Sequence, residues 1–194
     1  MMPLLSNPKL RLFVLLVAMF LANRVQSQGW NTARLTVLYG GNIPFNFNTI
    51  DKFKHGIDIG TGTILGISLT DLGVKGHKLN GFELNFRSFN NQTEIKGDVY
   101  NLPLNRLRVR AENILGLGTG TSYGYNDLAT DWVTLFSYTE RKWKDLDWTT
   151  HQLRISYECG KPLAEGGNGS LLGEGSDSYQ VEIEFELVPT GSGF

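Results

Sequence analysis

Histidine, cysteine and carboxylate side chains are the residues of this chain best suited to catalysis or metal binding. The three histidines, His55, His77 and His151, are widely spaced from one another and from the single cysteine, Cys159. A protein metal site recognisable from sequence brings such ligands together at short, regular spacings. The acidic residues at 127, 131, 145 and 147 also lack the alternating oxygen ligands and central glycine of a calcium loop. The spacing therefore predicts no catalytic residue, no metal site and no cofactor.

Two Gly-Thr-Gly-Thr tetrads, at residues 60–63 and 118–121, suggest a phosphate-binding loop at first sight. Neither completes the dinucleotide-binding spacing, and neither supplies the Gly-Lys-Ser/Thr sequence of a nucleotide-binding loop. No helix is predicted after either tetrad to present its N-terminal N–H groups to an anion. We predict turns or bulged strand ends at both places.

Trp143 and Trp148 lie in a segment that also carries Lys142, Lys144 and two aspartates. Exposed aromatic faces flanked by polar groups could stack on a sugar ring, so these two residues are the candidates for ligand stacking on a glycan. The alternative is structural, with one Trp in the core and the other covering an edge of the fold.

Composition narrows the class of protein. The 194 residues carry 18 basic and 19 acidic side chains, a net charge of −1, which leaves no electrostatic footprint for nucleic acid. A single cysteine excludes an intramolecular disulfide framework and every multi-cysteine zinc motif. A hydrophobic fraction of 41% with 11% aromatic residues is enough for a packed core. These numbers indicate a globular domain and favour no particular chemistry.

The N-terminus has the three parts of a secretory signal peptide over residues 1–27. Lys9 and Arg11 supply the positive flank, an apolar run of 11 residues follows at 12–22, and Val25 and Ser27 occupy the −3 and −1 positions of a cleavage site. The run is shorter than the ~18–20 apolar residues of a membrane-spanning helix, although a retained N-terminal anchor stays the alternative. We therefore expect a chain that is secreted or displayed at the cell surface, with no membrane span in the mature residues 28–194.

Apolar and polar residues alternate with a period of two along the rest of the chain, as is typical of half-buried strands. The apolar positions of the six runs are Ala33, Leu35, Val37 and Tyr39; Phe45 and Phe47; Phe82, Leu84 and Phe86; Leu107, Val109 and Ala111; Leu153, Ile155 and Tyr157; and Tyr179, Val181, Ile183, Phe185 and Leu187. Turn-forming residues separate the runs, at 40–42, 90–91 and 166–170. The pattern predicts an all-β fold, a single antiparallel β-sandwich of Ig-like or pilin-like type.

Residues 28–194 show no domain boundary. The one linker-like stretch, residues 163–178, precedes a single strand that could not form a domain alone, so we predict a surface loop between paired strands. The alternative to an all-β fold is an α+β domain with a helix over residues 126–139. The β-branched and aromatic residues of that segment favour a strand instead.

Two predicted strands carry opposite charges on their outward faces. One face holds Arg106, Arg108, Arg110 and Glu112. The other holds Gln180, Glu182, Glu184 and Glu186. Like charges in a row repel, and a neighbouring strand of opposite sign relieves the repulsion. We predict that these strands are neighbours in one sheet; the alternative places them on different sheets, each face solvated by itself.

Four blocks of the chain carry a family resemblance. They are residues 44–50 followed by Phe53 and the 56–57 pair, residues 102–104 leading into 107–113, residues 153–157, and residues 179–188. Together they resemble secreted Bacteroidetes β-sandwich proteins of pilin-like or adhesin-like character. The resemblance implies an extracellular, non-enzymatic sandwich that serves as a subunit of a fimbrium or another adhesive complex. The chain differs from chaperone–usher pilins in having one cysteine and no penultimate tyrosine.

Our expectation is a structural subunit that associates with itself or with other surface subunits in cell adhesion. Residues 28–39 directly follow the predicted cleavage site and alternate well enough to complete a neighbour's sheet. Ala33, Leu35, Val37 and Tyr39 are therefore the candidate strand-exchange residues; the alternative is an ordinary first strand of the same sandwich. A carbohydrate-binding module or adhesin tip is the second function considered. A secreted hydrolase is the third, because catalytic partners can meet only in space.

Overall fold

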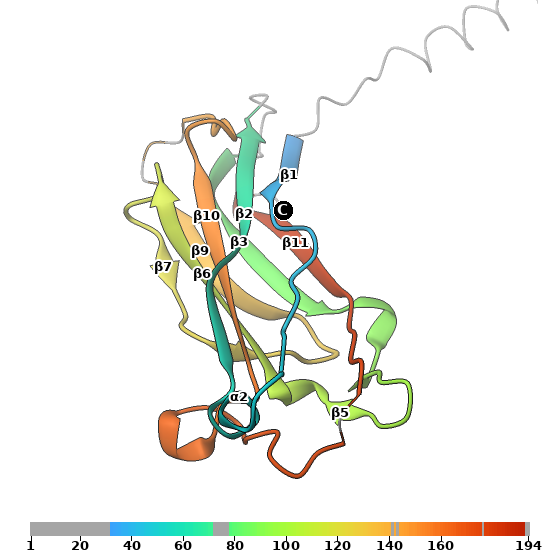
Figure 1. Ribbon diagram of the computed structural model, residues 1–194. Helices are drawn as coiled ribbons and strands as arrows, with labels where there is room; N and C mark the ends of the chain where they lie inside the picture. The colour runs from blue at the N-terminus through green and yellow to red at the C-terminus, as the bar shows by residue number, and fades with distance from the viewer. Residues whose placement is uncertain (1–31, 72–77, 141, 143, 176, 193–194) are drawn as a thin grey trace, which may run out of the picture. The chain divides into compact units, whose positions relative to one another are not determined.

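The computed structural model describes residues 32–71, 78–140, 142, 144–175 and 177–192 (Figure 1). Within them two antiparallel β-sheets pack face to face, so the predicted all-β sandwich is confirmed. The predicted signal peptide at residues 1–27, the start of the candidate donor segment at 28–31, His77 and Trp143 lie outside the described residues.

The first sheet has five strands in the order β1-β2-β10-β6-β8. Their bounds are β1 (Thr32–Tyr39), β2 (Ile57–Thr70), β10 (Gln152–Cys159), β6 (Leu107–Leu115) and β8 (Asn126–Asp127). The second sheet has the order β11-β3-β9-β7, with β11 (Ile183–Ser192), β3 (Lys78–Ser88), β9 (Val133–Thr139) and β7 (Thr121–Ser122). Neighbouring strands are antiparallel in both sheets, and β1 and β11 are edge strands.

Short elements lie in the connections between the strands of the two sheets. They are a hairpin of β4 (Glu94–Ile95) and β5 (Leu102–Pro103), the helix α2 (Ile50–His55), and 3₁₀ turns at Phe89–Asn91, Leu104–Arg106 and Leu163–Glu165. The alternation of the sequence does not predict α2. The helix begins where Thr49 Oγ1 accepts the N–H of Lys52 at 3.3 Å, and it ends at Gly56, whose φ is +75°. It reverses the chain between β1 and β2 (Figure 1).

The predicted apolar faces of β3, β6 and β10 are buried between the sheets. The buried residues are Phe82, Leu84 and Phe86; Leu107, Val109 and Ala111; and Leu153, Ile155 and Tyr157. The rings of Phe82 and Phe136 lie 6.2 Å apart, and those of Phe86 and Phe185 lie 6.5 Å apart. The second sheet therefore supplies an aromatic half of the core, in the offset arrangement that aromatic rings favour.

Residues 126–139 form β8 and β9, so the α+β alternative is wrong. The prediction of turns or bulged strand ends is confirmed for the second Gly-Thr tetrad, whereas the first is an irregularity within a strand and not at its end. The first lies inside β2, where the pairing with β10 shifts register between Ile155 and Tyr157. The second is a turn, closed by a hydrogen bond from the Gly120 N–H to the Leu117 carbonyl at 2.9 Å.

The predicted pairing of the arginine strand with the glutamate strand is wrong. β6 belongs to the first sheet and β11 to the second. The charges are balanced by closer partners: Arg108 Nη1 lies 2.6 Å from Glu158 Oε1 on β10, and Glu184 Oε2 lies 3.0 Å from Arg87 Nε on β3. Complementary charge does hold between neighbouring strands, but acids nearer than β11 supply it to β6.

The last strand begins later than the alternation predicts. β11 starts at Ile183, and residues 179–182 precede it outside both sheets. The loop of residues 163–178 leads from β10 in the first sheet toward β11 in the second, so the prediction that it joins paired strands is wrong. Alternation marks a strand but says nothing about which sheet the strand enters.

Candidate functional site

β1 places the four candidate strand-exchange residues at the free edge of the first sheet. Its register with β2 runs from Thr32 opposite Thr70 to Val37 opposite Leu65 and then shifts, so that Tyr39 lies opposite Ile64, on the other face from Val37. Ala33 is exposed, Leu35 packs partly against the core, and Val37 and Tyr39 are 58% and 62% exposed. The apolar face of β1 is therefore only partly covered in its own sandwich.

Gly40 ends β1 and turns the chain away from β2. Its φ is +71°, and a Cβ at this position would overlap the carbonyl oxygen of Gly62. Thr63 Oγ1 donates to the Gly40 carbonyl at 2.6 Å and lies 2.9 Å from the Tyr157 hydroxyl. These contacts fix the point at which the chain leaves the sheet.

Residues 43–47, which we name the first lip, follow this turn on the way to α2. Ile43, Phe45 and Phe47 are half-buried and pack against the core, whereas Pro44 and Asn46 are exposed. The rings of Phe45 and Phe47 lie 6.5 Å apart. Among the residues that the structure describes, the backbone N–H and C=O groups of Ile43, Phe45 and Phe47 make no hydrogen bond. The first lip thus has the side-chain pattern of a strand without a paired neighbour.

Residues 179–182, which we name the second lip, lead into β11. Gln180 exchanges both backbone hydrogen bonds with Lys96, at 2.7 and 3.0 Å, and the Phe89 N–H donates to the Glu182 carbonyl at 2.9 Å. In an antiparallel pair this geometry turns the backbone groups of the adjacent residues, Tyr179 and Val181, to the opposite edge. Those groups make no hydrogen bond within the described part of the chain.

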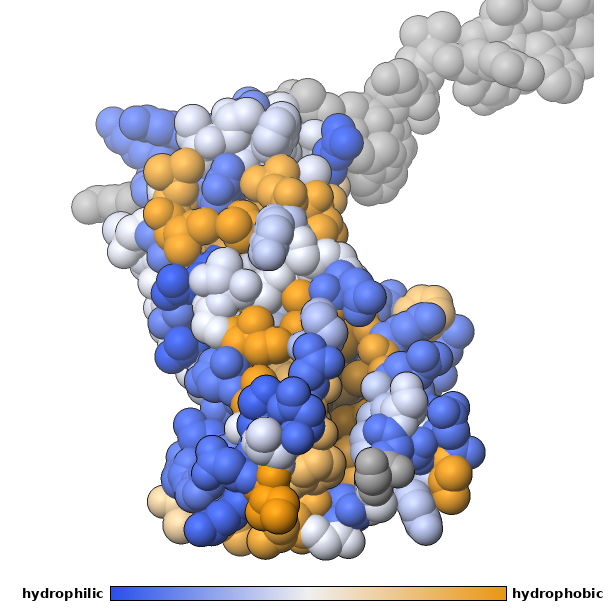
Figure 2. Space-filling view, viewed as in Figure 1, coloured by the Kyte–Doolittle hydropathy of each residue, from blue (hydrophilic) through white to orange (hydrophobic). Residues whose placement is uncertain are grey.

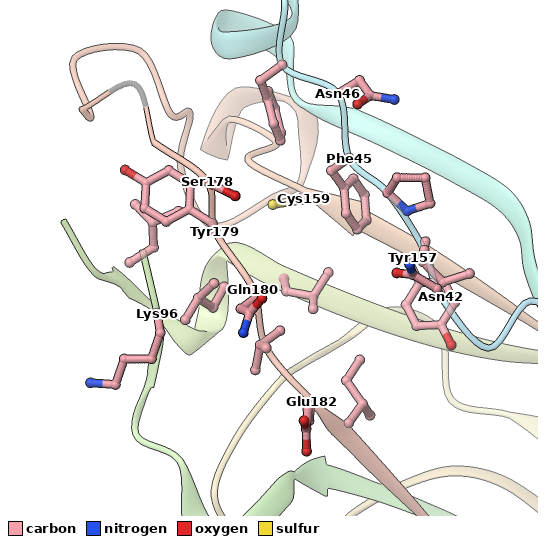
Figure 3. Close-up of a pocket in the computed structure, with 18 of the residues that line it drawn as sticks. Asn42, Phe45, Asn46, Lys96, Tyr157, Cys159, Ser178, Tyr179, Gln180 and Glu182 are labelled. Atoms are coloured by element: carbon pink, nitrogen blue, oxygen red, sulfur yellow. The ribbon is translucent and has the colours of Figure 1, made fainter. Parts of the chain in front are cut away.

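The two lips border a groove of about 1360 Å³ between the edges of the sheets. Its lining includes the core residues Leu65, Leu107, Tyr157, Cys159 and Leu171. The space-filling view shows apolar surface in a hollow in the lower half of the domain (Figure 2). Phe45 and Tyr179 stand on opposite sides of the groove, with Cys159 between them in this view (Figure 3). The groove therefore has an apolar floor and a polar rim, and each lip carries backbone groups that have no hydrogen-bond partner among the described residues.

Asp177 anchors the start of the second lip. Its carboxylate accepts the backbone N–H groups of Asp98, Val99, Tyr100 and Ser178 at 2.7–3.1 Å. These hydrogen bonds, above all those from Tyr100 and Val99, hold the pKa of Asp177 below its ordinary value. The loop between β4 and β5 is thereby tied to the second lip.

The titratable groups on the floor of the groove stay neutral near pH 7. Burial raises the pKa of the Tyr157 hydroxyl to about 12, and burial raises the pKa of the Cys159 thiol to about 12. A thiol nucleophile needs its thiolate form, which this environment disfavours. The groove therefore suits contact with apolar groups and not nucleophilic chemistry at Cys159.

The two tryptophan candidates are not brought together by anything that the structure describes. Trp148 lies on the loop before β10 and is 42% exposed, and its backbone N–H donates to Ser68 Oγ at 3.2 Å. It packs beside Gly66 of β2. Trp143 lies outside the described residues, so a stacking platform made by both residues stays a prediction.

Two histidines follow an aspartate by four residues: His55 contacts the carboxylates of Asp51 and Glu165, whereas His151 contacts the backbone of Asp147. His55 lies 3.8 Å from Asp51 and 2.5 Å from Glu165, and His151 accepts the backbone N–H of Asp147 at 3.1 Å. In the described residues no group of three or more His, Cys, Asp or Glu side chains is arranged to hold a metal ion. The same residues include no helix with the length and apolar character needed to cross a bilayer.

Sequence reasoning marked residues on each side of the groove but did not predict the groove. The signal was present as the short alternation at Phe45 and Phe47 and the longer one that starts at Tyr179. Only the three-dimensional fold places these two segments opposite each other. The chain matches no protein-family model, and the search of curated proteins found no match.

Proposed function

We propose that this chain is an exported, non-enzymatic structural subunit of a surface filament or adhesive complex that assembles by strand addition through residues 28–39. The observation that carries the proposal is the incompletely covered apolar face of β1, on which Ala33 is exposed and Val37 is 58% exposed. An edge strand presents unpaired N–H and C=O groups that can pair with another chain, and its alternate side chains can fill pockets there.

Two features of the sequence support the proposal. The pattern of residues 1–27 supports export, and cleavage after Ser27 would leave β1 close to a free N-terminus. The resemblance of four blocks to secreted Bacteroidetes sandwich proteins supports a place at the cell surface.

Size-exclusion chromatography and negative-stain imaging of the exported chain test this function. We expect oligomers or filaments from the wild type. Val37→Asp places a charge on the half-open apolar face of β1 and should give monomers. Arg34→Asp changes an exposed residue on the other face of the same strand and should assemble as the wild type does. A wild-type chain that stays monomeric at every concentration contradicts the proposal.

A carbohydrate-binding function is the second candidate, and the exposed indole of Trp148 is the observation that favours it. Glycan-array binding followed by titration tests it. Trp148→Ala should abolish glycan binding, whereas Trp132→Ala removes a ring that Arg87 covers at 4.3 Å and should leave binding intact. Equal affinity in the wild type and Trp148→Ala would rule this candidate out.

A further inference from the structure

We propose that the groove between the first and second lips is an acceptor site for an extended strand, and that its occupant is β1 of a second copy of this chain. The inference rests on the proposed strand addition and deepens it. Strand addition names the donor segment, and the groove supplies the surface that receives it.

The backbone of the two lips indicates the kind of occupant. Ile43, Phe45 and Phe47 on one side, and Tyr179 and Val181 on the other, carry N–H and C=O groups that make no hydrogen bond among the described residues. Backbone polar groups in folded proteins are nearly always paired, by protein or by water. An extended strand laid between the lips would pair with both edges. A lipid chain or another apolar small molecule would leave the same groups without partners.

The side chains of the groove indicate the pattern that the occupant must have. The floor is apolar where it is formed by Leu65, Leu107 and Leu171, and the outer rim is polar where it is formed by Asn46 and Gln180. A strand in this position would direct alternate residues to the floor and the remainder to solvent. The occupant is therefore an extended segment with apolar residues at every second position.

β1 meets these requirements within the described chain. Its positions 33, 35 and 37 are apolar and alternate with the polar residues at 34 and 36, and the strand ends with the apolar pair Leu38 and Tyr39. Eight residues of extended chain span about 27 Å, which exceeds the ~13–17 Å of each lip. In its own sandwich β1 pairs with one strand, β2, whereas the groove offers it an edge on each side. Strand exchange would therefore replace one ladder of backbone hydrogen bonds with two.

Val37 lines the groove of its own copy, and it leaves that groove when its β1 is donated to the next copy. The two lips and the apolar floor stay with the acceptor. Donor and acceptor are different surfaces of one chain. Such a heterologous contact continues from copy to copy unless its rotation closes a ring. The groove thus accounts for a filament and not merely for a dimer.

A peptide of residues 28–39 with a fluorophore at its N-terminus tests the site on the exported chain. We expect saturable binding, and none by a peptide of the same composition in which the alternation is scrambled. Val181→Pro removes an N–H that faces the groove and should weaken binding at least about fivefold. Glu182→Pro is the matched control, because it removes the neighbouring N–H on the edge that faces Phe89. Equal affinity in both proline variants, or equal binding of the scrambled peptide, overturns the proposal.

Cross-linking to Cys159 gives a second readout, since this thiol lies on the groove floor and is the one cysteine of the chain. Under oxidising conditions at alkaline pH, which offsets the raised pKa of the buried Cys159 thiol, peptides with cysteine at position 35 or 37 should form a disulfide with Cys159, and a peptide with cysteine at position 36 should not. The Cys159→Ala variant should form no disulfide with any of these peptides. Equal cross-linking from all three positions overturns the proposed orientation of the strand and with it the acceptor site.

Different results would overturn the acceptor site and the filament. Filaments that persist unchanged in Val181→Pro overturn the acceptor site and leave strand addition at another surface. A chain that captures the peptide in the groove but stays monomeric by itself overturns the filament and supports the acceptor site.

Discussion

Arg108 on β6 and Glu158 on β10 lie opposite each other in register, and Arg108 Nη1 is 2.6 Å from Glu158 Oε1. The Glu158 side chain is 1% exposed, and its other oxygen lies 3.4 Å from Lys161 Nζ. A carboxylate held this far from water depends on its cationic partners. This pair joins two neighbouring strands of the first sheet.

Removal of Arg108 should be costly, because it leaves the buried Glu158 with one cation. We expect Arg108→Ala to lower the free energy of unfolding by about 3–5 kcal/mol, measured by urea denaturation. Lys96→Ala removes an exposed pair with Glu94 at 3.1 Å and should cost less than about 1 kcal/mol. Similar losses in both variants would show that Glu158 is not held by Arg108.

Charge reversal distinguishes true strand neighbours from the pairing predicted by charge alone. Arg87 and Glu184 face each other on β3 and β11, so Arg87→Glu combined with Glu184→Arg should recover roughly 0.2–1 kcal/mol relative to the sum of the single changes. For Arg108→Glu combined with Glu184→Arg, the losses in the free energy of unfolding should simply add, because β6 and β11 lie in different sheets. Recovery in the second double variant would contradict the strand order.

Local pattern predicts the strands of this protein well and their neighbours poorly. The period of two placed Phe82 to Phe86 and Leu153 to Tyr157 on buried faces, because alternation is a property of each strand by itself. The partner of β6 depends on contacts between residues distant in sequence, which alternation does not encode. The groove also depends on contacts between residues distant in sequence, since its two lips are more than 130 positions apart in the chain. The helix α2 was missed because six residues are too few to show a helical period.

Gly40 should tolerate no side chain, because it combines a φ of +71° with a backbone carbonyl where a Cβ would stand. Gly40→Ala should destabilise the fold by at least about 1–3 kcal/mol and loosen the junction between β1 and the first lip. Gly41→Ala is the matched control, with nothing within 4 Å of its Cβ position. Thermal unfolding measures both, and a Gly41→Ala loss as large as that of Gly40→Ala would contradict this role.

Asp177 should make the free energy of unfolding depend on pH in the acid range. Its folded pKa lies below the ordinary value, so the folded state binds fewer protons than the unfolded state as the pH falls. The stabilisation is present above the ordinary Asp pKa of about 4 and is lost as the pH falls through the lower folded value. Asp177→Asn should therefore be less stable at pH 7 and should lose less stability than the wild type between pH 4 and lower values.

Urea denaturation at a series of pH values measures this difference. Asp98→Asn is the control, because the Asp98 carboxylate accepts no hydrogen bond among the described residues. It should follow the wild-type curve. Parallel curves for the wild type and Asp177→Asn would show that the anchor of the second lip contributes nothing to the acid dependence.

Deletion of residues 28–39, followed by addition of that segment as a separate peptide, tests strand addition most directly. Circular dichroism reports whether the shortened chain folds, and size-exclusion chromatography with the labelled peptide reports capture. Strand addition predicts a folded chain that does not form filaments alone and binds the peptide in trans. A shortened chain that unfolds, or one that folds and ignores the peptide, would make β1 an ordinary first strand and contradict the proposed assembly.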